Sequence, residues 1–197
     1  MTNSMNNIEF TKELVESQFK TIKTEVVDQY QISFEVQTAD VHQLLSVLKT
    51  SGWRQLSYLS AIDWPDENKF EVVYILMNWD KAVHVQIRTK IDRENPSMNS
   101  ILPIFAGAKY YERECHEFFG IKFPGNPEYM KQLILEGWDD IPPLRKDFDP
   151  AAYSAKKFPQ REYSETYIVS DPEKSPQAKR AARKERTESL KTKGGKK

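Results

Sequence analysis

Apolar and polar residues alternate along the middle of the chain, which is the pattern of half-buried strands. The runs Arg54 to Trp64, Lys69 to Trp79 and Ala82 to Ile91 are joined by short polar turns, as antiparallel neighbours are. An earlier pair, Thr21 to Val27 and Gln31 to Val36, alternates in the same way. The run Lys69 to Trp79 is apolar on both faces, so we expect it to be the central strand.

Three other stretches repeat apolar residues at the spacing of a helix with one buried face. These faces are Phe10, Leu14, Val15 and Phe19; Val41, Leu44, Leu45 and Leu48; and Tyr111, Cys115, Phe118 and Phe119. Gly120 follows the third stretch and can adopt the left-handed conformation that ends a helix. The pattern predicts an α+β fold in which helices cover one face of a mostly antiparallel sheet.

The composition divides the chain into four parts. Residues 1–8 are polar and expected to be mobile, whereas residues 9–123 carry the strands and helices of one core domain. Residues 124–170 are rich in proline and aromatic residues, and they predict an extended docking arm. Residues 171–197 are basic and predict a solvated or disordered tail.

Charge is distributed unevenly although the whole chain is neutral. Residues 172–197 contain ten Lys or Arg and three Glu, a net charge of +7, so residues 1–171 carry −7. The tail lacks interleaved aromatic residues, and we expect no nucleic-acid partner. The chain shows neither a leader pattern nor a membrane-spanning apolar run, and Cys115 is its single cysteine. We therefore expect a soluble, intracellular protein without an internal disulfide.

Cys115, His116 and the glutamates around them suggest a reactive or metal-binding site. Adjacent helical residues point about 100° apart, so Cys115 and His116 do not converge on one ion. Glu112 and His116 share a face at i, i+4, but two ligands are too few for a metal site. Cys115 lies on the apolar stripe, where a thiol is unreactive. We interpret the chain as non-catalytic; the alternative is a small enzyme or metal-binding protein that uses Glu112 and His116.

Three motifs stand between Glu112 and Phe148: Glu112-Arg113-Glu114, Phe119-Gly120-Ile121 and Pro143-Leu144-Arg145-Lys146-Asp147-Phe148. Together they resemble the thirty-kilodalton subunit family of respiratory complex I. His116-Glu117 replaces an aromatic residue and an aspartate of NADH dehydrogenase members, and Asn126 replaces a histidine. The string from Glu114 to Ile121 is more similar to relatives in energy-converting membrane-bound hydrogenases and archaeal-type dehydrogenases.

The resemblance implies that residues between Glu112 and Phe148 form a family motif and an interface with partner subunits. They are Glu112, Arg113, Glu114, His116, Glu117, Phe119, Gly120, Pro127, Trp138, Pro143, Leu144, Arg145, Lys146, Asp147 and Phe148. We expect the charges of Glu112-Arg113-Glu114 and of Arg145-Lys146-Asp147 to form ion pairs within the chain or between subunits. We also expect Phe118 to Phe148, and the arm as far as Tyr167, to lie across a partner.

By the same resemblance, the chain is a structural subunit without a cofactor that is not catalytic by itself. Its partners would be a large subunit with a quinone or nickel–iron site and adjacent iron–sulfur subunits, with the membrane arm reached indirectly. Its place would be the cytoplasm, at the inner face of the cell membrane. The donor, whether NADH, ferredoxin or coenzyme F420, and the acceptor, whether quinone, phenazine or proton, stay open.

Overall fold

The structure is a computed structural model that describes residues 2–158, 180 and 183–185. It divides into two compact units, Met1–Phe148 and Asp149–Lys197. The elements of the first unit are α1 (Thr2–Glu16), β1 (Lys23–Asp28), β2 (Gln31–Glu35), the 3-10 turn η1 (Thr38–Asp40), α2 (Val41–Thr50), β3 (Gln55–Trp64), the 3-10 turn η2 (Pro65–Glu67), β4 (Lys69–Asn78), β5 (Val83–Asp92) and α3 (Ala108–Phe119).

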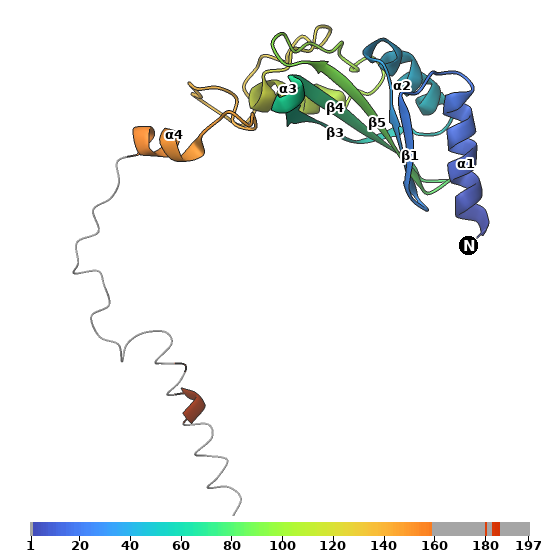
Figure 1. Ribbon diagram of the computed structural model, residues 1–197, viewed down its shortest axis with the longest axis horizontal. Helices are drawn as coiled ribbons and strands as arrows, with labels where there is room; N and C mark the ends of the chain where they lie inside the picture. The colour runs from blue at the N-terminus through green and yellow to red at the C-terminus, as the bar shows by residue number, and fades with distance from the viewer. Residues whose placement is uncertain (1, 159–179, 181–182, 186–197) are drawn as a thin grey trace, which may run out of the picture. The chain divides into compact units, whose positions relative to one another are not determined.

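The five strands form one sheet in the order β1-β2-β5-β4-β3. Only β2 and β5 are parallel; the other three neighbouring pairs are antiparallel. This confirms the α+β fold with a mostly antiparallel sheet. Lys69 to Trp79 was expected to be the central strand; β4 does lie inside the sheet, but β5 takes the middle place because β2 adds to its other side. In Figure 1, α1 lies beside β1 at one end of this unit and α3 lies beside β3 at the other.

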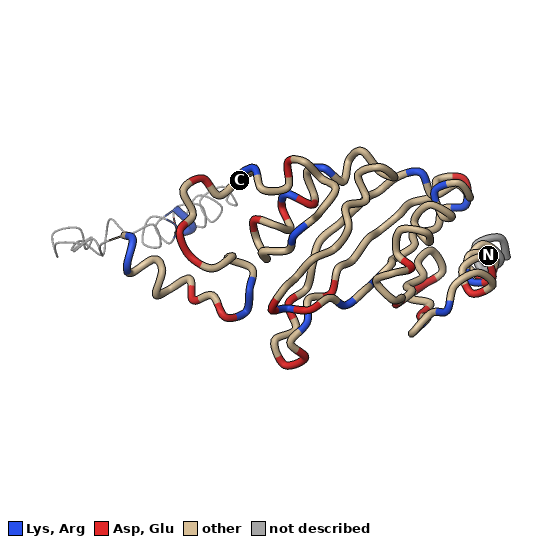
Figure 2. The backbone as a smooth tube through the Cα atoms, turned by 90° about the horizontal axis from the view of Figure 1, so that it is seen from above, with Lys and Arg blue, Asp and Glu red and all other residues tan. Residues whose placement is uncertain are grey.

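The helices cover one face of the sheet, as the sequence predicted. Alternate β5 residues, among them Val83, Val85 and Ile87, are fully buried in the same core as the apolar faces of α1, α2 and α3. Figure 2 shows that long stretches of the strands carry no charged residue. Within the described residues, the opposite sheet face is left without a helical layer.

The first helix differs from its prediction at both its start and its buried face. It begins at Thr2 instead of near Phe10, so the expected mobile segment 1–8 is largely helical. Its buried residues are Ile8, Thr11 and Val15, at i, i+3 and i+7, and Leu14 packs against the core half-buried, whereas Phe10 is 44% exposed. Phe19, which follows the helix, is buried as predicted. Thr11 is buried on this face although it is polar, because its hydroxyl donates to the Asn7 carbonyl at 2.6 Å and is thereby satisfied inside the core.

The second helix follows its prediction closely. Val41, Leu44, Leu45 and Leu48 are all fully buried. Gly52 has φ +112°, a conformation that a side chain would strain, and this lets the Trp53 N–H reach back to the Leu48 carbonyl at 3.0 Å. The Trp53 indole then donates to the Val83 carbonyl at 3.1 Å, which ties the end of α2 to β5.

The second unit contains a helix that was not predicted, α4 (Pro150–Lys157). Asp149 accepts hydrogen bonds from the N–H groups of Ala151 and Ala152, and Pro150 stands at the first helical position. An aspartate followed by proline is a helix-start signal, so the expectation of an entirely extended arm was wrong here. The remainder of the arm, 159–170, and most of the basic tail lie outside the described residues.

Candidate functional site

The third helix is the base of the candidate site. Its buried face is Ala108, Glu112, Cys115 and Phe119, and Tyr111 and Phe118 pack against the same core while half-buried. Gly120, with φ +83°, ends the helix as predicted, and its N–H donates to the His116 carbonyl at 2.8 Å. The Phe119 ring meets Phe70 of β4 edge-on at 6.0 Å between centroids. Motif residues Phe119 and Gly120 therefore anchor and end α3 within its own domain.

Glu112 lies outside the apolar stripe that the sequence predicted for α3, yet it faces the core. The side chain is fully buried because position 112 falls between core positions 108 and 115 on the helical period. Its carboxylate accepts hydrogen bonds from the Ser100 hydroxyl (2.7 Å), the Ile101 N–H (2.8 Å) and the Asn126 amide (2.9 Å). Burial raises the pKa of Glu112, and the bonds from Ser100, Asn126 and Ile101 offset only part of that effect.

Asn126 joins this buried carboxylate to the segment that follows α3. Its amide also donates to the Lys109 carbonyl at 3.2 Å, and its oxygen accepts the Glu128 N–H at 3.0 Å. Gly125, with φ +99°, lies against Ser100, so that a Cβ there would come within 3.3 Å of the serine Cβ. Asn126 therefore fixes the start of the segment on α3. Pro127, next in the chain, is exposed.

We call residues 124–148 the strap, and α3 holds its middle part through two charged side chains one turn apart. Arg113 donates to the carbonyls of Lys131 (3.1 Å) and Gln132 (2.5 Å). Glu117 accepts from the N–H groups of Leu133 (2.9 Å) and Ile134 (2.9 Å). Arg113 and Glu117, at i and i+4, thus satisfy four consecutive backbone groups of an irregular segment, which would otherwise depend on water. Glu114, between them in sequence, is exposed.

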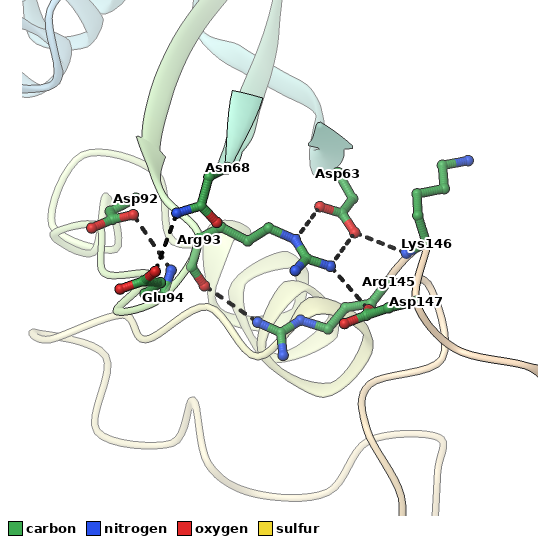
Figure 3. Close-up of polar contacts among 8 residues, drawn as sticks. All are labelled: Asp63, Asn68, Asp92, Arg93, Glu94, Arg145, Lys146 and Asp147. Carbon is green, nitrogen blue, oxygen red and sulfur yellow. Dashed lines mark hydrogen bonds and ion pairs between the residues drawn. The ribbon is translucent and has the colours of Figure 1, made fainter. Parts of the chain in front are cut away.

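The end of the strap is fixed to the sheet by Asp63 of β3 and Arg93, which follows β5 (Figure 3). Arg93 donates from Nε to Asp63 Oδ1 at 2.8 Å and from Nη2 to Asp63 Oδ2 at 3.0 Å. The same Nη2 is 2.9 Å from Asp147, and the Lys146 N–H donates to Asp63 at 2.8 Å. Arg145 donates to the Arg93 carbonyl at 3.3 Å. The Lys146 side chain points away from Asp63, so the contact uses its backbone.

Asp63 keeps its charge although its side chain is fully buried. Burial raises the pKa of Asp63, but the hydrogen bonds from Arg93 and Lys146 and the charges of Arg93 and Arg145 outweigh it, so the pKa lies below its usual range. Both guanidinium groups also lie over the Phe70 ring, 5.7 Å (Arg93) and 5.3 Å (Arg145) from its centroid. The expected ion pairs of the Arg145-Lys146-Asp147 motif therefore include one within the chain, between Asp147 and Arg93.

With its backbone held, the strap turns apolar side chains outward. Met130 (71% exposed), Ile134 (59%) and Leu144 (51%) are the clearest cases. The Leu144 N–H donates to the Phe118 carbonyl at 3.1 Å, so even this exposed residue has a fixed backbone. The expectation that residues 124–148 leave the domain as an extended arm was wrong, because the strap folds back along α3 and the sheet and belongs to the same compact unit.

The remaining motif residues support the strap from within. The Trp138 indole donates to the Ile141 carbonyl at 2.9 Å, and its ring lies 5.3 Å from that of Phe148. Pro143, which stands between these two aromatic residues in the sequence, is half-buried. Trp138 and Phe148 thus stabilise the loop that carries Leu144 outward.

Glu112 and His116 do not form a common site. His116 Nδ1 is 2.9 Å from the Ile121 carbonyl and its ring stands edge-on to Tyr129, 5.0 Å away, whereas Glu112 points into the core. Within residues 2–158, 180 and 183–185, no three His, Cys, Asp or Glu side chains are grouped to hold a metal ion. Burial raises the pKa of the Cys115 thiol well above its usual range, which makes it a poor nucleophile. Glu112 and His116 therefore do not converge in the way that the enzyme or metal alternative required.

Sequence reasoning missed Asp63 and Arg93, the residues that hold the strap to the sheet. A usable signal existed at Asp63, which follows Leu59 and Ala61 on the core-facing side of β3. A carboxylate at a core position requires a partner, and a buried carboxylate prefers arginine. The identity of that arginine, 30 residues away, was not readable from the pattern.

Comparison with known proteins places this arrangement in a family. The model of the family "Respiratory-chain NADH dehydrogenase, 30 Kd subunit" matches residues 34–154, more than half of the chain. The chain belongs to this family. The matched range includes β3, β4, β5, α3 and the whole strap, so both anchors of the strap fall inside the family region.

Individual relatives of the 30 kDa subunit family agree with this assignment. The chain is 31% identical over 152 residues to the mitochondrial NADH-ubiquinone oxidoreductase 30.4 kDa subunit of Neurospora crassa, covering 75% of this chain and 52% of that subunit. It is 34% identical over 97 residues to a subunit of the F(420)H(2) dehydrogenase of Methanosarcina mazei, covering 48% and 60%. The matches thus span about half the length of these curated relatives.

A solved structure extends the similarity to the fold. A chain of the membrane-bound sulfane sulfur reductase, an archaeal respiratory membrane complex, superposes with a TM-score of 0.72 and 29% identity, covering 81% of this chain and 96% of that chain. In the described part of our chain, no helix is long and apolar enough to span a membrane.

Proposed function

We propose that this 30 kDa-family chain is a structural subunit of the peripheral arm of a complex I-like membrane redox complex. The observation that carries the proposal is the strap, whose backbone is held by Arg113, Glu117 and Asp63 while its apolar side chains face outward. An ordered surface of this kind binds a partner at low entropic cost, because its backbone is already fixed before association. Met130, Ile134 and Leu144 then supply the apolar contact.

The partner we propose for the strap is the large subunit, which carries a quinone or nickel–iron site in such complexes, with iron–sulfur subunits beside it. The relatives are subunits of an NADH-ubiquinone oxidoreductase and an F(420)H(2) dehydrogenase, and the similar fold occurs in a sulfane sulfur reductase complex. The complexes that carry these names differ in their substrates. A positioning role is what they can share, since it does not depend on the electron donor or acceptor.

We propose further that the chain holds no redox group itself and reaches the membrane only through its complex. Support comes from how the chemically capable side chains are used: Glu112 binds three donors, Glu117 binds strap amides and His116 contacts a carbonyl. Each of these side chains forms hydrogen bonds that hold the backbone or a loop in place. An absorption spectrum of the purified chain should show only protein bands; iron–sulfur or flavin bands that copurify stoichiometrically would contradict this part.

Crosslinking of the native complex tests the partner assignment. Lys131 and Lys146 lie on the strap and Lys122 just before it, and all three are exposed. Amine-reactive crosslinks from these lysines should reach the large subunit, whereas Lys12 on α1 serves as the matched exposed lysine away from the strap. Crosslinks from the strap lysines that stay entirely within this chain would overturn the proposal.

A further inference from the structure

One half of the sheet face opposite the helices is apolar. The water-facing side of an antiparallel sheet is normally polar, so this half requires an explanation. Tyr58, Ile62 and Trp64 project from β3 on this side and are 47%, 37% and 40% exposed. The facing residues of β4 are also apolar near the centre: Tyr58 pairs with Ile75, and Ser60 pairs with Val73. None of these apolar side chains belongs to the core under the helices, and the Tyr58 ring also meets the ring of Tyr111 of α3 edge-on at 6.5 Å between centroids. They form a second apolar surface.

The other half of this face is a network of charged side chains around a hollow of roughly 250 Å³. Arg88 makes a bidentate pair with Glu71 at 2.9 Å, and Trp64 donates its indole N–H to the same carboxylate at 2.9 Å. Trp64 is thereby held in place at the boundary between the apolar and charged halves. Two further ion pairs line the hollow, Lys90 with Glu67 at 2.6 Å and Lys23 with Glu25 at 2.9 Å.

The lining of the hollow carries one more carboxylate than cations. Its carboxylates are Glu25, Glu35, Glu67 and Glu71, and its cations are Lys23, Arg88 and Lys90. The three ion pairs use one carboxylate each, so Glu35 supplies the excess charge. Glu35 lies in register between Lys23 of β1 and Arg88 of β5, in the middle of this network of charged side chains.

We propose that this open sheet face is a second protein-docking surface, and that its occupant is another subunit of the same complex. The occupant presents an apolar ridge to Tyr58, Ile62 and Trp64 and a Lys or Arg side chain to Glu35. The apolar half supplies the contact area, and the self-paired charges need no new counter-ion apart from that one cation. The inference rests on the proposed role in a complex, but it concerns a face separate from the strap.

Hydroxyl-radical footprinting of the free chain and of the purified complex tests this directly. Trp64 oxidises readily in the free chain, and in the complex its oxidation rate should fall at least about fivefold, as expected for a side chain in an interface core. Phe10, 44% exposed on α1 and therefore on the helical side of the sheet, is the matched aromatic residue and should keep its rate. Met130 reports on the strap in the same experiment.

The outcomes separate the two proposals. Protection of Met130 with no protection of Trp64 overturns the second docking surface and leaves the proposed function standing; protection of neither residue overturns both. Protection of Trp64 in the concentrated free chain means that a second copy covers the face. Protection of Trp64 by anionic phospholipid vesicles alone means that lipid covers it. Either of these last two results overturns the assignment to another subunit.

Substitutions give an independent test with controls that keep the fold. Ile62→Glu should lower the recovery of assembled complex about tenfold, because a carboxylate would be buried against an apolar partner. Phe10→Glu, at a residue 44% exposed on α1, should not. Glu35→Lys should lower the recovery of assembled complex more than Glu35→Gln does. Glu13→Lys on α1 makes the same change of charge away from this face and is the control. Equal thermal midpoints of the isolated variants exclude misfolding; normal assembly of Ile62→Glu overturns the inference.

Discussion

Asp63 and Arg93 face each other across the end of the sheet, with both guanidinium-to-carboxylate bonds at 3.0 Å or shorter. The Asp63 side chain is fully buried and that of Arg93 is 17% exposed. Asp63→Asn would leave Arg93 facing a neutral amide, and breaking a buried pair of this kind costs about 3 kcal/mol of unfolding free energy. Urea unfolding followed by circular dichroism measures this. Glu25→Gln, in the exposed pair with Lys23, is the control and should leave the urea midpoint unchanged.

Acid should remove the contribution of this pair. The pKa of Asp63 is lowered in the folded protein, so its stabilisation is present above the unfolded aspartate pKa of about 3.9 and is lost as the pH falls through the lower folded value. The difference in unfolding free energy between wild type and Asp63→Asn should therefore shrink as the pH falls below about 4. A difference that stays constant down to about pH 2 would show that Asp63 does not stabilise through its charge.

Glu112 should show the opposite dependence on pH. Its folded pKa is raised, so the stabilisation linked to its protonation is complete below the unfolded glutamate pKa of about 4.3 and is lost as the pH rises through the folded value. Relative to Glu112→Gln, which cannot ionise, wild type should lose stability as the pH increases above about 4.3. Urea unfolding of both proteins from about pH 4 to about pH 8 gives the comparison, and parallel curves would contradict it.

Glu117 should control the order of the strap locally. Glu117→Gln leaves one oxygen for two N–H groups, so the amides of Leu133 and Ile134 should exchange with deuterium about tenfold faster, the effect of losing one charge-assisted hydrogen bond. Hydrogen exchange with fragment analysis over 128–140 measures this. Glu114→Gln, at the exposed position one turn earlier, is the control and should exchange at the wild-type rate.

Arg145 should affect assembly and leave the chemistry of the assembled complex unchanged. Arg145→Ala removes the bond to the Arg93 carbonyl and the contact over Phe70, which loosens the strap where Leu144 faces outward. We expect several-fold less assembled complex and unchanged turnover per assembled complex. Quantifying the complex on native gels beside its specific activity separates the two effects. Normal assembly with slow turnover would refute the structural role of the chain.

Periodicity predicted the parts of this protein that are stabilised by local pattern. The face of α2, the end of α3 at Gly120 and the five strands all follow from spacing, because burial of one face dictates which positions are apolar. The same rule failed at Glu112 and Thr11, which are polar but lie at core positions of their helices. Each forms hydrogen bonds inside the core, so it can stand where the pattern requires an apolar residue.

The attachment of the strap could not be predicted from spacing at all. Lys146 and Asp63 are 83 residues apart, and nothing in either neighbourhood specifies the other. What the sequence did show was that the motif around Arg145 is charged and followed by an aromatic residue. Which charges meet depends on where β3 and β5 end in the sheet, and that is a tertiary property.

The 83-residue separation between Asp63 and Lys146 also has a consequence for the order of events in synthesis. Contacts between distant positions form late in folding, after the intervening strands and α3 have found their places. The outward apolar residues of the strap are therefore displayed in their fixed arrangement only by a chain that has completed its domain. A partner that recognises this arrangement selects finished subunits and ignores unfinished ones.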